Sequence, residues 1–118
     1  MKKYLVILQQ APYANSQSLE ALELALALAA FAQPVTLLFM GAGLLQLLNA
    51  QASDLISHKT FTQAYTGLNL FEISAVYMEQ QALQKYQLSA TDLSISPEPL
   101  AADQIASLIA KHDIVLSF

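Results

Sequence analysis

Five short apolar runs recur along the chain, separated by longer stretches that mix apolar and polar residues. The runs span residues 4–8, 35–40, 73–78, 93–96 and 114–118. Runs of this length, rich in branched or aromatic side chains, are typical of buried strands. Pro97 and Pro99 follow the weak fourth run, and we expect them to close it because proline cannot extend a strand ladder from inside. The pattern predicts five strands.

The first stretch between two runs has the composition of a helix. Asn15 or Ser16 can cap it by accepting a hydrogen bond from an N–H group of the first turn. We expect the helix to continue to about Ala32, where Gln33 and Pro34 end it. The alternation of leucine and alanine at 24–30 also fits a strand, but both residues are strong helix formers and the stretch is long. We therefore interpret it as a helix.

This helix lacks a polar face over most of its length. After Glu23, no polar residue occurs until Gln33. A helix that is apolar on all sides is normally buried on all sides. We expect one face to pack on the sheet and the other to contact a neighbouring chain.

Further helical segments follow the remaining apolar runs. They are expected at 44–48 (after the turn 41–43), at 54–59 and 61–68 as one or two pieces, at 79–86 and at 101–111, with a loop at 89–92. In the last helix we expect Ile105, Leu108 and Ile109 to face inward. Strands that alternate with helices imply a parallel sheet covered on both faces. The predicted fold is a single α/β domain over residues 1–118, with three α/β/α layers and a five-stranded, mainly parallel sheet.

The composition predicts an assembly component. Charged residues make up 12% of the chain and apolar residues 55%, whereas ordinary soluble domains have about 25% charged residues. A domain of this size cannot hide so much apolar surface by itself. Large exposed apolar patches usually mark contacts with other chains. We therefore expect an obligate oligomer.

Charge and hydropathy exclude several classes of protein. The net charge is −4, and the five basic residues leave no cationic stripe for direct nucleic-acid binding. The run at 4–8 follows Lys2 and Lys3 as in a signal peptide, but it is too short and lacks a cleavage site. No stretch approaches the roughly 20 apolar residues of a membrane span. We expect neither secretion nor a membrane association.

Candidate chemistry lies where the predicted strands end, because ligands of open α/β sheets gather at the carboxyl ends of strands. The candidate strand-end pocket comprises Pro12, Asn15, Gly41, Gly43, Met78 and Glu79. The turn 41–43 could offer N–H groups to an anion, but it lacks the third glycine of a dinucleotide fingerprint and the lysine of a P-loop. A tight turn is the favoured interpretation. We expect no cofactor.

Acid–base and metal chemistry receive little support from the residues. Glu79 could act as a general base, yet the sequence places no histidine, lysine or second acid beside it. A solvated glutamate at a helix N-terminus is favoured. Asp54 and His58 are spaced to share a helix face, but these two and the distant His112 are too few for a metal site. We expect no catalytic residues and no metal.

Several motifs resemble the DsrE/DsrF-like family over essentially the whole chain. Residues 39–48 read Phe-Met-Gly-Ala-Gly-Leu-Leu-Gln-Leu-Leu, similar to the F-x3-G-x2-Q-L-L pattern of the TusC (DsrF-type) subunits, which this chain resembles most within the family. Pro12 after the first strand and Pro99-Leu100 before the last helix fit as well. The ending 113–118 is like the family's D-x-[IV]-L-x-F. Order and spacing together make the resemblance specific.

The resemblance implies a role in sulfur transfer. It implies a subunit of a cytoplasmic sulfur-relay complex in which TusB-, TusC- and TusD-like chains assemble as a heterohexamer. That complex passes persulfide sulfur toward 2-thiouridine synthesis at the tRNA wobble position. In sulfur-oxidising bacteria, DsrE, DsrF and DsrH chains form a similar assembly. The resemblance also implies the three-layer α/β fold.

One departure from the family bears on the role of this chain. Sulfur-carrying members have a cysteine at or just after the end of the third strand, and the matching position here is Glu79, with Met78 as the near alternative. The chain contains no cysteine, and neither a carboxylate nor a thioether can form a persulfide by thiol exchange. The sequence thus predicts a non-catalytic structural subunit with TusB-like and TusD-like partners.

Two rival functions remain open at the level of sequence. The first is a stand-alone homo-oligomer of the same family that binds a small ligand at the strand ends. The second is a small α/β enzyme that uses Glu79, whose activity would be lost in Glu79→Gln while the fold survived.

Overall fold

The computed structural model describes residues 2–11, 17–48, 73, 75–93 and 95–118. The helices predicted at 54–59 and 61–68, and the cap residues Asn15 and Ser16, lie outside the described residues. None of the helices in these described ranges is long and apolar enough to cross a membrane.

Five strands form one sheet in the order β4-β3-β2-β1-β5, and all four neighbouring pairs are parallel. The strands are β1 (Tyr4–Leu8), β2 (Val35–Phe39), β3 (Ala75–Glu79), β4 (Glu98–Leu100) and β5 (Ile114–Ser117). The predicted α/β class and five-stranded parallel sheet are confirmed.

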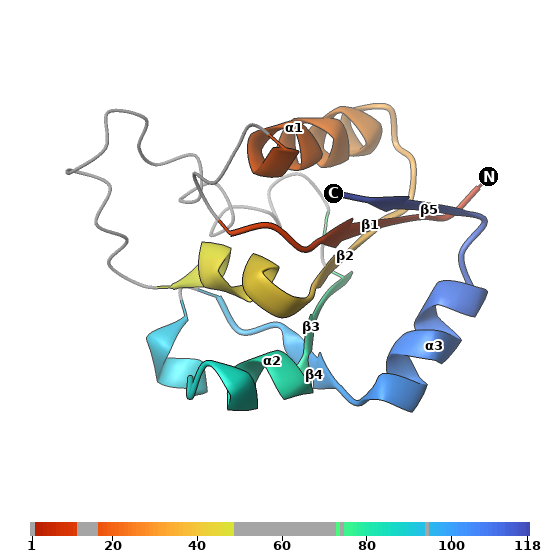
Figure 1. Cartoon of the computed structure of the whole chain (residues 1–118). Helices are drawn as coiled ribbons and strands as arrows, with labels where there is room; N and C mark the ends of the chain where they lie inside the picture. Colours follow the sequence, from red (N-terminus) through yellow and green to blue (C-terminus); the bar gives the residue numbers. More distant parts are fainter. Residues whose placement is uncertain (1, 12–16, 49–72, 74, 94) are drawn as a thin grey trace, which may run out of the picture.

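Helices lie on both faces of the sheet (Figure 1). Helix α1 (Gln17–Ala30) packs on one face and α3 (Ala102–Ala110) on the other. The 3-10 helix η1 (Gly41–Leu47) and helix α2 (Gln80–Lys85) directly follow β2 and β3, at the carboxyl ends of these strands. A second 3-10 turn, η4 (Ala90–Asp92), precedes β4.

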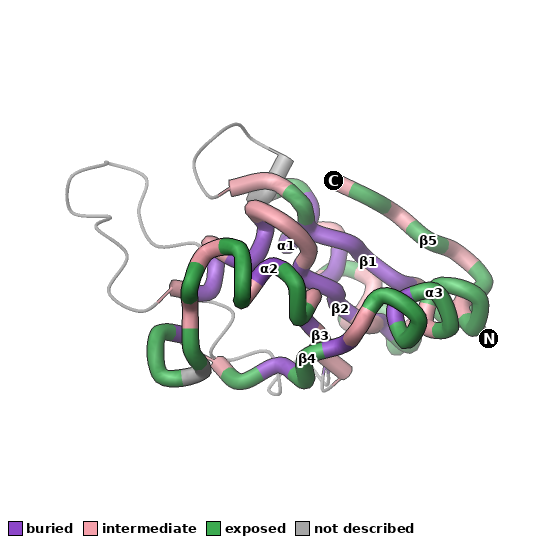
Figure 2. The backbone as a smooth tube through the Cα atoms, turned by 60° about the horizontal axis from the view of Figure 1, so that its bottom comes forward, coloured by how far each residue is buried: buried purple, intermediate pink, exposed green. Residues whose placement is uncertain are grey.

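Successive side chains of each strand point to opposite faces, and this alternation builds two cores. In β1, Val6 and Leu8 join the core beneath α1, whereas Leu5 and Ile7 join the one beneath α3. All four are nearly inaccessible to solvent, and Figure 2 shows the buried backbone concentrated in β1 and β2. Burial on both sides explains why these strands are continuous apolar runs rather than alternating ones.

The predicted fourth strand at 93–96 was wrong. Of the segment's described residues (93, 95 and 96), only Leu93 forms a bridge, antiparallel to Leu48, and β4 lies further along at Glu98–Leu100. Pro99 sits inside this strand, paired in register with Met78. Proline is tolerated there because β4 is an edge strand. On its outer side no neighbouring strand requires an N–H donor, so the missing N–H group of proline costs no hydrogen bond.

Helix boundaries differ from the predicted ones by a few residues. Helix α1 ends at Ala30 because Ala32 adopts a positive φ of 59°, and the Gln33 N–H closes the end by donating to the Leu28 carbonyl. The helix expected at 44–48 is a 3-10 helix that begins earlier, at Gly41. The last strand ends at Ser117.

The expected inward face of the last helix was partly wrong. Ile105 is buried and Leu108 partly buried, but Ile109 is 37% exposed. Only one helix covers this side of the sheet among the described residues, so α3 has a narrower buried face than a helix packed between two layers.

Candidate functional site

The turn between β2 and η1 meets the end of β3. Gly41 has a φ of 52°, a conformation that glycine adopts without strain. Its N–H donates to the Glu79 Oε1 atom at 2.9 Å. Two of the predicted strand-end residues, 38 positions apart in the sequence, are therefore in direct contact. The Glu79 side chain is partly buried.

Gly43 and Gln46 hold η1 against the carboxyl end of β1. A Cβ atom on Gly43 would lie 1.9 Å from the Leu8 carbonyl oxygen, so only glycine fits. Gln46 is 1% exposed, and its Nε2 atom donates to the Gln10 carbonyl at 2.9 Å. Phe39 and Leu47 are also fully buried. The residues of the F-x3-G-x2-Q-L-L motif are therefore those that pack η1 against the sheet.

These contacts favour the tight-turn interpretation of residues 41–43 over anion binding. The Gly41 N–H is engaged by Glu79, and the Gly43 N–H donates to the Met40 carbonyl at 2.9 Å. Two of the amides that could have faced a phosphate are therefore already satisfied. An internal carboxylate occupies the one position where an anion would bind Gly41.

Among the described residues of the predicted strand-end pocket, Met78 does not lie with Gly41 and Glu79. Met78 is 3% exposed and lies in the core beneath α1, which removes it from the pocket. β3 runs to Glu79 instead of ending at Met78, so these two neighbours point to opposite faces. Pro12 and Asn15 lie outside the described residues.

The strand order reverses between β1 and β5, which is where open α/β sheets most often bind ligands. In this structure hydrogen bonds join the carboxyl ends of these two strands. The Gln9 N–H donates to the Phe118 carbonyl at 2.9 Å, and the Gln9 side-chain amide hydrogen-bonds the Ser117 hydroxyl. The contact between Gly41 and Glu79 lies one strand away, at the ends of β2 and β3.

Two other residues singled out in the sequence have structural partners. His112 Nδ1 donates to the Leu108 carbonyl at 2.7 Å, and its Nε2 atom lies 3.1 Å from the Thr36 hydroxyl, which ties the end of α3 to β2. The Asp113 carboxylate accepts a 2.8 Å bond from the Lys3 N–H at the start of β1. Within the described ranges, no group of three histidine, aspartate or glutamate residues could hold a metal. Asp54 and His58 lie outside those ranges.

Residues 2–118 match the model of the DsrE/DsrF-like family. The chain belongs to the DsrE/DsrF-like family. Its relatives within the family include proteins of both the TusC and the DsrF type. It is 29% identical to a TusC homologue of Vibrio vulnificus (strain CMCP6) and 26% identical to TusC of Escherichia coli O8, in both cases over 100% of each chain. It is 34% identical to the intracellular sulfur oxidation protein DsrF of Allochromatium vinosum, over 100% of this chain and 97% of DsrF.

The fold of this DsrE/DsrF-like chain also matches a solved structure. The crystal structure of the ychN protein from E. coli superposes with a TM-score of 0.82, covering 100% of both chains at 20% identity. At this identity the likeness concerns the three-layer architecture alone.

Gln46 is the residue whose role the sequence analysis missed. From the sequence alone, Gln46 stands out only as the glutamine of the F-x3-G-x2-Q-L-L motif. The sequence did contain a sign of this role: Gln46 is a single amide side chain between two pairs of leucines. A buried amide needs a hydrogen-bond partner, so a partner for Gln46 could have been predicted. Its partner, the Gln10 carbonyl, lies 36 positions away and could not be named from the pattern.

Proposed function

We propose that this chain is a non-catalytic subunit of a cytoplasmic sulfur-relay complex of the TusBCD type, which supports 2-thiouridine synthesis at the tRNA wobble position. One observation carries the proposal. The chain has no cysteine, and Glu79 stands at the end of β3, the position that the family resemblance gives to the sulfur-carrying cysteine.

The chemistry of sulfur transfer explains why this observation matters. A persulfide forms when a thiolate attacks a donor sulfur, and it is passed on when a second thiolate attacks the terminal sulfur. A carboxylate has no sulfur to be attacked. In this chain the Glu79 carboxylate instead accepts the Gly41 N–H and fastens the β2 turn to the end of β3. The transferred sulfur must therefore reside on a partner.

Exposed apolar side chains support the assembly part of the proposal. Phe31 is 78% exposed just beyond the end of α1, and Val115 of edge strand β5 is 39% exposed. Large apolar side chains in such places are common at contacts between chains. TusB-like and TusD-like chains are the proposed partners, because TusC proteins are among the full-length relatives.

A second candidate function rests on the 34% identity to DsrF, whose name describes intracellular sulfur oxidation. The two functions share the assembly role and the absence of a carrier cysteine on this chain. They differ in the neighbouring genes: TusB- and TusD-like reading frames favour the tRNA pathway, whereas DsrE- and DsrH-like frames favour sulfur oxidation. An isolated gene would favour the stand-alone homo-oligomer.

Transfer of radiolabelled sulfur tests the non-carrier role. We incubate the purified chain, alone and in the reconstituted complex, with a cysteine desulfurase and [35S]cysteine. We expect no covalent label on this chain and reductant-sensitive label on a partner chain, because only a thiolate can accept the sulfur. Glu79→Ala should leave labelling of the partner intact. Reductant-sensitive label on this chain would contradict the proposal.

A further inference from the structure

A groove runs along α3 on the side of the sheet opposite α1. Its upper part is a cavity of about 420 Å³ near the amino ends of β2 and β3. The lower part, about 260 Å³, continues toward β4. Tyr77, Leu108 and Lys111 line both parts. The volume of the upper cavity falls within the range of small-molecule sites, about 300–1,000 Å³.

The upper cavity combines an apolar floor with a cationic rim. Pro34, Ala75 and Leu108 provide apolar surface, and Lys3, Thr36, Tyr77, Lys111 and His112 provide the polar groups. Val35 also lines the cavity, but its side chain belongs to the core beneath α1. No carboxylate is among these lining residues. The chain as a whole has nine acidic and five basic residues, so a cavity with two lysines and no acid departs strongly from its average.

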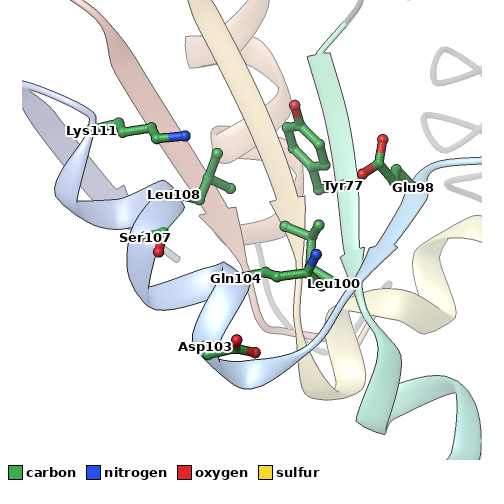
Figure 3. Close-up of a pocket in the computed structure, with 8 residues that line it drawn as sticks. All are labelled: Tyr77, Glu98, Leu100, Asp103, Gln104, Ser107, Leu108 and Lys111. Carbon is green, nitrogen blue, oxygen red and sulfur yellow. The ribbon is translucent and has the colours of Figure 1, made fainter.

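Two carboxylates line the adjoining lower part of the groove, and one of them, Glu98, is the register partner of Tyr77. Glu98 and Asp103 line only the lower part of the groove. In Figure 3 the Lys111 ammonium and the Tyr77 hydroxyl lie toward one end of the groove and Asp103 lies at the other; Glu98 is at the same end as Tyr77, on the side of the ring away from Lys111. The Asp113 carboxylate is engaged by the Lys3 backbone N–H and does not line the cavity.

The end of α3 adds little negative potential to the cavity. A helix C-terminus carries a partial negative charge on its unpaired carbonyls. Here the Leu108 carbonyl accepts bonds from the Lys111 N–H at 3.2 Å and from the His112 ring at 2.7 Å, and the Ile109 carbonyl accepts the His112 N–H at 3.3 Å. These donors offset the helix charge next to the two lysines.

We propose that this upper cavity binds a small organic oxyanion, a carboxylate or phosphate ester with a short apolar body. The oxyanion contacts the Lys3 and Lys111 ammonium groups and the Tyr77 hydroxyl, and the apolar body lies on Pro34, Ala75 and Leu108. The site is separate from the contact between Gly41 and Glu79, and it does not depend on the sulfur-relay role.

Phenyl phosphate is a suitable probe, because it joins the two chemical features in one molecule. We titrate it into the 15N-labelled full chain and follow the backbone amide signals, with phenol and inorganic phosphate as the separate halves. Sodium chloride keeps the ionic strength constant, since surface electrostatics are screened by salt. We expect saturable shifts at Thr36, Ala75 and Lys111 with a dissociation constant of about 1 mM or below. Each half should bind at least about tenfold more weakly.

Paired lysine variants separate a specific site from general charge attraction. The double variant Lys3→Gln/Lys111→Gln should weaken phenyl phosphate binding about tenfold or more, through loss of charge-assisted hydrogen bonds. The control, Lys2→Gln/Lys85→Gln, removes the same charge from two exposed lysines that do not line the cavity and should bind as the wild type does. Tyr77→Phe should weaken binding less than the lysine pair, because it keeps the ring.

Three results would overturn the proposal. The first is the absence of saturable shifts at the cavity up to about 10 mM phenyl phosphate, far above the expected dissociation constant. The second is equal binding of phenol and phenyl phosphate, which would show an apolar pocket without anion recognition. The third is an equal loss of binding in the two double variants, which would show attraction to net charge alone.

Discussion

Two glycines in the turn after β2 have different physical reasons to be glycine. Gly41 has a positive φ and free space around its Cα, whereas Gly43 lies against the Leu8 carbonyl, where a Cβ atom would sit 1.9 Å from the oxygen. The sequence shows both as turn residues and cannot separate these roles. The separation depends on the contact between η1 and β1, which joins residues far apart along the chain.

Replacing Gly43 should therefore be more damaging than replacing Gly41. We expect Gly43→Ala to lower the free energy of unfolding by about 1–3 kcal/mol, because the backbone of β1 or η1 must move. Gly41→Ala should cost about 1 kcal/mol through its backbone conformation alone, and Gly41→Asn less, since asparagine tolerates a positive φ. Urea unfolding of the three variants measures this order. A Gly43→Ala variant as stable as the wild type would contradict the close contact.

The hydrogen bond between the Gly41 N–H and the Glu79 carboxylate should contribute to the free energy of unfolding. We expect Glu79→Ala to lower the free energy of unfolding by about 1 kcal/mol, a value kept small because the carboxylate is partly exposed. Glu79→Gln retains an oxygen acceptor and should lose less. The same urea titrations compare the two variants. Equal stability of Glu79→Ala and the wild type would assign the contact no energetic role.

At the scale of elements, α1 presents two unlike faces. Ala21, Leu22 and Ala25 are buried against the sheet, while Ala27 and Ala30 are exposed. The sequence predicted a helix apolar on every side, and the structure divides it into a covered face and a face that no described residue covers. Glu20 and Glu23 are exposed on the same side near the start of the helix, and beyond them this exposed side is apolar, which makes it the expected site of a partner on a subunit of low charge.

A charge on this face should disrupt assembly more than folding. Ala27→Asp places a carboxylate where the partner is proposed to pack, and burying an unpaired charge is severely unfavourable. We expect the oligomer to dissociate, while the far-ultraviolet circular dichroism of the chain remains that of the folded protein. Ala106→Asp, a similar exposed alanine on α3, is the matched control and should keep the assembly intact. If Ala27→Asp retains the full oligomeric mass, α1 is not an interface.

Element prediction succeeded where burial is uniform and failed where it is not. Strands β1 and β2 were recognisable because both of their faces are buried, which leaves a continuous apolar run. The edge strand β4 was misplaced because its three residues include Pro99, and nothing local shows that one side of an edge strand lacks a partner. A one-residue difference at the end of β3 moved Met78 into the core, because neighbouring strand residues face opposite ways.

At the scale of the whole molecule, the sheet brings distant segments together in an order that the sequence did not reveal. The alternation of strands and helices predicts a parallel sheet, but the order β4-β3-β2-β1-β5 depends on contacts between non-neighbouring segments. The same holds for the candidate site, where the sequence placed Gly41 and Glu79 at one edge without predicting their hydrogen bond. The low fraction of charged residues, by contrast, is a property of the whole chain that does not depend on which segments meet. Assembly could therefore be predicted from composition directly.

Native mass measurement after co-expression with the neighbouring genes tests the assembly claim most directly. We expect one species that contains this chain together with TusB-like and TusD-like partners, because they would cover its exposed apolar surface. Expressed alone, the chain should form homo-oligomers or aggregate. A chain that purifies without partners and stays a well-behaved monomer at about tens of micromolar, a concentration at which subunits usually associate, would contradict the account.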